Sequence, residues 1–165
     1  MGARENLGVL QESATTITEA RASTNYIDLA ETKPQIGVGQ GTPYLCIRTA
    51  VAPTGTVDTL SIEVQVDDNS SFTSPRTVFF PFAVGSSDPY TGGGVAEALQ
   101  THPRLATAGA WIFRGQLPYE VEERYLRLYF NNTVSAGAFA IDAWLEEGPQ
   151  SDFGNQVLVS PVGNP

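Results

Sequence analysis

The feature that most constrains the fold is a strict alternation of apolar and polar residues in the middle of the chain. Residues 59–66 read TLSIEVQV, so every second side chain is aliphatic and those between are polar. Successive side chains of a strand point to opposite faces, so this pattern predicts an antiparallel strand buried on one face and solvated on the other. The segment DDNSS at 67–71 is rich in residues that bond their own backbone, and it should end the strand.

The same period of two recurs along the chain and predicts further strands. In residues 24–29, Tyr26 and Asp28 should face one side of the sheet, and Ile27 and Leu29 the other. Further strands are expected at 44–51, 75–82, 104–114, 124–130 and 136–145. Pro81 cannot donate a ladder hydrogen bond, which places 75–82 at a sheet edge or a bulge.

Three details complete the expected strand arrangement. Consecutive Trp111, Ile112 and Phe113 suggest a strand that is buried on both sides or that lies under a neighbouring element. Short turns predict two hairpins, one joining 44–51 to 57–67 and one joining 124–130 to 136–145. Residues 95–100 could form either a helical turn or a strand. About eight short strands without helical periodicity predict an all-β antiparallel β-sandwich of jelly-roll-like form.

A chain of 165 residues is expected to form one domain with its own core. We place the jelly-roll-like sandwich at 24–147, between an N-terminal arm (1–23) and a C-terminal tail (148–165). The arm is either disordered in the free protein or ordered against a neighbouring subunit. The apolar patch at 156–159 is either a last strand or a segment that pairs with the sheet edge of another chain.

The charge balance narrows the classes of partner. The net charge is −9 and Lys33 is the single lysine, which argues against nucleic-acid binding and against anionic membranes. No apolar run is long enough for a membrane helix. The N-terminal MGARENLG lacks the apolar stretch of a signal peptide, so we expect a protein made in the cytoplasm.

No catalytic, metal or cofactor site is predicted. Cys46 is expected to be an apolar filler, and His102, the only histidine, a surface residue. The glycine-rich stretch 37–41 precedes a strand rather than a helix, which disfavours a phosphate loop. Weaker alternatives are calcium at Asp67–Asn69, a glycosidase carboxylate pair, and a hydrolase using Asp67 or Glu122.

Outward aromatic residues and the apolar residues of the two arms remain as candidates for a binding surface. Such a row of side chains can bind sugar or another protein, and the protein interface is the commoner case. The candidate interface residues are Leu7, Val9, Leu10, Tyr90, Tyr125, Tyr129, Trp144, Phe153, Val157, Leu158 and Val159.

Several motifs, taken in order, resemble a known family. They are TNYIDL (24–29), PYLCIRT (43–49) after the glycine-rich loop, TLSIEVQVDDNSSFTSP (59–75), ERYLRLYF (123–130) and AFAIDAWLEE (138–147). Over roughly residues 24–147 the chain resembles the Bbp16-like capsid cement (decoration) proteins of tailed bacteriophages. The departures lie in the N-terminal arm, the 83–103 insert and the tail after 148.

The resemblance implies a non-enzymatic structural virion protein. Such a protein would form a dimer or trimer on the outside of the capsid and clamp neighbouring major capsid proteins, without a cofactor. The rival from another class is a carbohydrate-binding sandwich used for host adhesion.

Overall fold

The computed structural model describes residues 6–12, 15–29, 43–54, 60–84, 102–117, 122–132 and 138–147. Within these ranges the chain forms strands and no helix. The strands are β1 (Asn6–Gln11), β2 (Arg21–Ala22), β3 (Ile27–Asp28), β4 (Pro43–Val51), β5 (Leu60–Asp67), β6 (Arg76–Val84), β7 (Trp111–Gln116), β8 (Tyr125–Asn132) and β9 (Ala140–Glu147).

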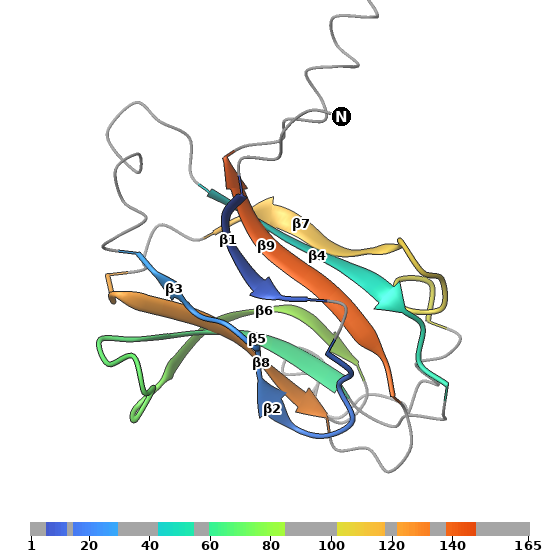
Figure 1. Cartoon of the computed structure of the whole chain (residues 1–165), viewed down its shortest axis with the longest axis horizontal. Helices are drawn as coiled ribbons and strands as arrows, with labels where there is room; N and C mark the ends of the chain where they lie inside the picture. The colour runs from blue at the N-terminus through green and yellow to red at the C-terminus, as the bar shows by residue number, and fades with distance from the viewer. Residues whose placement is uncertain are drawn as a thin grey trace, which may run out of the picture.

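The strands build two antiparallel sheets that face one another (Figure 1). One sheet, here called the β4 sheet, has the order β1-β9-β4-β7. The other, the β5 sheet, has the order β2-β8-β5-β6, and β3 pairs with β8 beside β2. The all-β, antiparallel β-sandwich predicted from the sequence is confirmed.

The strand pairs are nested in the sequence. β5 pairs with β6, β4 with β7, both β2 and β3 with β8, and β1 with β9. The chain is thus a long antiparallel ribbon, which is rolled so that β9 also meets β4 and β8 also meets β5. This is the strand order of a jelly roll.

The two predicted hairpins are wrong. β4 and β5 lie in different sheets, as do β8 and β9, so neither pair shares a ladder. In a nested ribbon the chain crosses between the sheets after each of these strands, and the hydrogen-bonding partner comes from the opposite end of the sequence. The period of two specifies which face is buried, but it does not specify the neighbouring strand.

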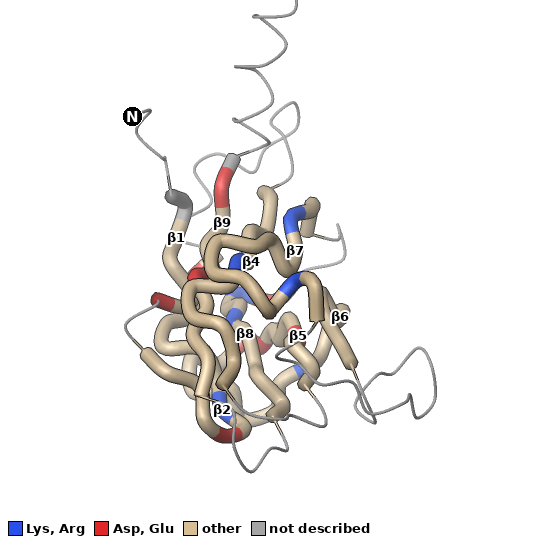
Figure 2. The backbone as a smooth tube through the Cα atoms, turned by 90° about the vertical axis from the view of Figure 1, so that its right-hand side faces the viewer, with Lys and Arg blue, Asp and Glu red and all other residues tan. Residues whose placement is uncertain are grey.

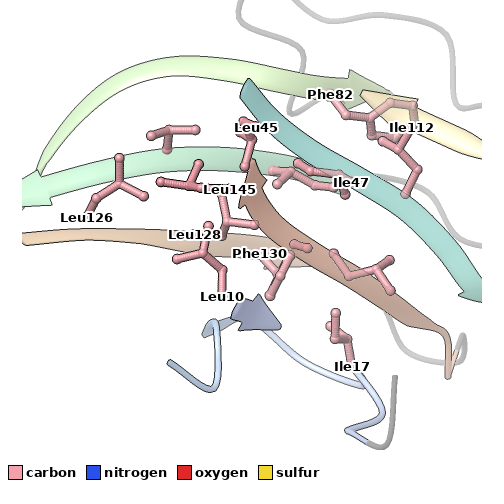
Figure 3. Close-up of a cluster of buried hydrophobic side chains, with 14 of the residues drawn as sticks. Leu10, Ile17, Leu45, Ile47, Phe82, Ile112, Leu126, Leu128, Phe130 and Leu145 are labelled. Carbon is pink, nitrogen blue, oxygen red and sulfur yellow. The ribbon is translucent and has the colours of Figure 1, made fainter. Parts of the chain in front are cut away.

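The core lies between the two sheets, and alternate residues of their strands supply it (Figure 3). Leu45 and Leu145 enter it from the β4 sheet, and Leu128 and Phe130 from the β5 sheet; each is at most 1% exposed. The predicted faces are confirmed for β3, where Ile27 is buried and Tyr26, just before the strand, is exposed. Pro81 lies in β6, an edge strand of its sheet as expected.

The polar face of β5 is less solvated than expected. Ser61 is 1% and Gln65 8% exposed. β5 is an inner strand, so side chains from both neighbouring strands lie over its outer face. Arg127 of β8 donates through Nε to Gln65 Oε1 (3.0 Å), and Thr77 of β6 donates to Glu63 Oε2 (3.0 Å).

The described part of the N-terminal segment, which we expected to be an arm, pairs and packs with the sandwich. β1 pairs with β9, and Leu10 and Ile17 are fully buried. Gly8 allows β1 to approach the second layer, because a Cβ at this position would lie 2.9 Å from the Ile27 side chain. The predictions for residues 30–42, 85–101 and 148–165 fall outside the described residues.

Replacing Leu10 by Ala should lower the free energy of unfolding by about 2–5 kcal/mol, because it leaves a cavity between the sheets. The matched control is Val51→Ala at an exposed position of β4, with an expected change within about 0.5 kcal/mol. Urea unfolding followed by fluorescence measures both. Equal, small losses for the two variants would show that β1 is dispensable to the fold.

Candidate interaction surface

The outer face of the β4 sheet gathers aromatic and charged side chains in cross-strand rows. Because Leu45 and Ile47 point into the core, the alternate residues of β4 point outward, and the same holds for β9. Strand register places Arg48 between Trp111 of β7 and Asp142 of β9, and Cys46 between Arg114 and Trp144. We call this surface the Trp–Arg face; its residues are Arg48, Trp111, Arg114, Asp142, Trp144 and Glu146.

Two ion pairs fix the arginines of this face. Arg48 donates through Nε (2.9 Å) and Nη2 (2.8 Å) to Asp142 Oδ2. Arg114 Nη2 donates to Glu146 Oε1 at 3.0 Å, and the indole Nε1 of Trp144 donates to Glu146 Oε2 at 3.3 Å. These side chains are 15–35% exposed, so each pair contributes at most about 1 kcal/mol to folding.

Both arginines also contact an indole ring. The guanidinium of Arg48 lies 5.5 Å from the Trp144 ring centroid, and that of Arg114 lies 5.4 Å from that of Trp111. The two indoles are tilted against each other with centroids 5.8 Å apart. Trp144 is almost covered, at 5% exposed, whereas Trp111 is 44% exposed. The face therefore presents one large aromatic ring that its neighbours hold in place.

This arrangement suits recognition of another protein. Trp and Arg are the residue types that most often dominate binding energy at protein interfaces, particularly when neighbouring residues fix them. The charges are paired within the face, so a partner that covers them does not have to neutralise an isolated ion.

Trp111 was missed as a surface residue, because three consecutive apolar residues suggested burial on both sides. Ile112 is buried and Trp111 is exposed, and the ladder between β4 and β7 shifts register between Ile47 and Arg48. A bulge of this kind turns a side chain to the other face. Arg48 could have been found, because it alternates with the inward residues of its strand.

The candidate interface residues do not form one surface. Trp144 belongs to the Trp–Arg face and Val9 pairs with it in the β1–β9 ladder, whereas Leu10 lies in the core. Tyr125 and Tyr129 lie on β8, on the outer face of the β5 sheet. Leu7 lies in β1. Outside the described residues fall Tyr90, Phe153, Val157, Leu158 and Val159.

Polar side chains at the turn after β5 accept hydrogen bonds from the backbone of that turn. The Asp67 carboxylate accepts the N–H groups of Asn69 and Ser74, both at 2.9 Å, and Asn69 Oδ1 accepts that of Ser71 at 2.8 Å. In the part of the chain that the structure describes, no three His, Cys, Asp or Glu residues lie close enough to hold a metal ion.

His102 begins a turn, where its Nδ1 accepts the Arg104 N–H at 3.2 Å.

Basic and acidic residues are interspersed along the described backbone (Figure 2). Besides the pairs of the Trp–Arg face, Arg76 pairs with Glu123 (2.6 Å) and Arg124 with Asp28 (2.6 Å). The Arg76 guanidinium holds the pKa of Glu123 below its usual value by hydrogen bonding. No helix among the described residues is long and apolar enough to cross a membrane.

Comparison with known families gives one assignment. Residues 12–143 match the family model Bbp16, a phage-related protein family. The match covers more than half of the 165-residue chain, so the protein belongs to the Bbp16 family. A search of curated proteins finds no match.

Cys46 is the cross-strand neighbour of Arg114 and Trp144 and is fully buried. Burial and, second to it, a hydrogen bond with Glu146 together raise the pKa of its thiol to about 12. At pH 8 the thiolate fraction should therefore be about one part in 10⁴. The prediction that Cys46 is a small apolar filler is confirmed. Its side chain lies on the outer side of the β4 sheet.

The native protein should therefore react very slowly with Ellman's reagent at pH 8, and the protein in guanidinium chloride should react at once with one thiol per chain. Absorbance of the released thiolate measures both rates. Labelling of the native chain as fast as of the unfolded chain would contradict the burial of Cys46.

Proposed function

We propose that this protein is a structural virion protein without enzymatic activity, a capsid cement (decoration) protein. In this proposal it binds the outer surface of a phage capsid and stabilises the contacts between major capsid protein subunits. It is made in the host cytoplasm and is located on the capsid exterior.

Family membership supports the phage context, and the motifs that resemble the cement proteins support the particular role. The fold is compatible with it. Every described strand from β1 to β9 is paired within the two sheets, so little conformational entropy should be lost in this part of the chain when it binds a lattice.

The observation that carries the proposal is the exposed, fixed indole of Trp111. The ring is 44% exposed, so a partner that covers it removes apolar area from water, which is favourable. Arg114 and Trp144 already hold the ring, so binding does not have to order it. The Trp–Arg face is the surface that we assign to the major capsid protein.

The physical effect on the capsid follows from linkage. A protein that binds the assembled lattice better than free capsid subunits shifts the assembly equilibrium toward the lattice. Association of the cement protein with further copies of itself, as a dimer or trimer, makes each additional capsid contact effectively intramolecular, so that modest contacts add up.

Trp111→Ala should weaken capsid binding by about 2 kcal/mol per site, or roughly 30-fold, since central Trp residues contribute on this scale at interfaces. Co-sedimentation with capsids that lack the protein measures occupancy, and thermal release of the packaged genome measures stabilisation. Wild-type protein should raise the release temperature, and the variant should fail to do so at equal concentration.

The matched control is Tyr26→Ala, which removes an aromatic side chain of similar exposure (50%) that lies outside the Trp–Arg face. This variant should bind capsids as the wild type does. Absence of any wild-type binding to capsids would refute the proposed function, and equal binding by the Trp111→Ala variant would refute the assignment of the face.

A further inference from the structure

A groove of about 780 Å³ opens at the side of the sandwich where β1 and β3 meet. Its walls come from β1, the link between β2 and β3, the start of β8, and the turn between β5 and β6. Tyr26, Tyr125, Asp28, Arg124, Asn25 and Ser70 are among the residues that line it. The volume is in the range of small-molecule sites. None of its lining residues belongs to the Trp–Arg face.

Tyr26 provides an aromatic platform in this groove. The side chain is 50% exposed, yet its ring is fixed by edge-type contacts with Tyr125 (centroids 5.5 Å apart, 87°) and Phe72 (6.1 Å, 61°). A fixed ring gives a flat, weakly negative surface against which polarised C–H groups can pack. It loses little entropy when a ligand covers it.

A planar pair of charged groups lies beside the platform. Arg124 donates to both carboxylate oxygens of Asp28, through Nε to Oδ1 (3.0 Å) and Oδ2 (3.1 Å) and through Nη2 to Oδ2 (2.6 Å). The guanidinium also lies 5.1 Å from the Tyr125 ring centroid. Donors and acceptors are thereby held together in one place, as adjacent hydroxyl groups of a ligand require.

The charge of the groove disfavours the binding of charged ligands. Asp28 and Arg124 neutralise one another, and the other lining residues are uncharged. The chain as a whole carries −9, so an anionic ligand would be repelled at long range and would meet no excess of positive charge in the groove. A neutral ligand is favoured.

The lining also favours a polyhydroxylated ligand over an apolar peptide. Hydroxyl, amide and charged groups predominate, and Val9 is the one aliphatic residue among the described residues that line the groove. A protein anchor would require a deeper apolar pocket. A hexopyranose has an apolar C–H face for Tyr26 and adjacent hydroxyl groups for the Asp28–Arg124 pair.

We propose that this groove binds neutral hexopyranose sugars. This activity is independent of capsid binding. A virion that carries many copies would gain from avidity, so an affinity on the order of 1 mM for a single short ligand would suffice for adhesion to a glycan surface.

The test uses the full chain on an array that carries neutral and anionic glycans, followed by saturation-transfer NMR with the neutral trisaccharides maltotriose, mannotriose and chitotriose. We expect binding to at least one neutral glycan. Tyr26→Ala should weaken it at least tenfold. Ser70→Trp, which fills the groove from an exposed turn position, should do the same without touching the platform. Trp111→Ala should leave sugar binding unchanged.

Each variant is first checked by thermal unfolding, and the conservative variant Tyr26→Phe should keep the binding. The proposal is overturned if the wild type binds no neutral glycan, if it binds only anionic ones, or if binding survives both Tyr26→Ala and Ser70→Trp. Because Tyr26→Ala should retain capsid binding and Trp111→Ala should retain sugar binding, the failure of one proposal is distinguishable from the failure of the other.

Discussion

The apolar contact between the inward rows of β5 and β8 on one side and of β4 and β9 on the other holds the molecule together. These four strands are the inner strands of their sheets, and the apolar side chains that they contribute to the core are at most 1% exposed. Burial of these rows supplies the main favourable free energy of folding, because the surface ion pairs are too exposed to contribute much. The outer strands β1, β6 and β7 are fixed by pairing to this central body.

The nested strand pairing explains how one sandwich can carry two separate surfaces. β1 and β9 come from opposite ends of the described chain, and their pairing brings Val9 beside Trp144. The same β1 lines the groove through Gly8 and Val9, on the side away from β4. A single edge strand thus lies between the Trp–Arg face and the groove.

The sequence predicted which face of a strand is buried much better than it predicted which strands pair with each other. Alternation identified the aliphatic residues of 59–66 as the buried side of their strand, and Leu60, Ile62, Val64 and Val66 are fully buried, because burial depends on the period of two within one strand. It could not identify β9 as the partner of β4, since that pairing spans about a hundred residues and depends on the rolled ribbon. Burial of Ser61 likewise depends on neighbours that alternation does not reveal. Of the interface candidates, Trp144 was placed on the correct side of its strand, but the exposed residue beside it, Trp111, was hidden by a bulge.

The Trp–Arg face and the groove differ in the physical basis of binding, and this difference suits them to different ligands. The Trp–Arg face is a sheet surface in which charges are already paired, so its binding energy should come mainly from covering apolar area, with weak dependence on salt. The groove is concave and polar, so its selectivity should come from hydrogen-bond geometry around Asp28 and Arg124. Trp111 and Tyr26 are 44% and 50% exposed and so contribute little to the core, which means that each surface could be altered at its exposed ring without loss of the fold.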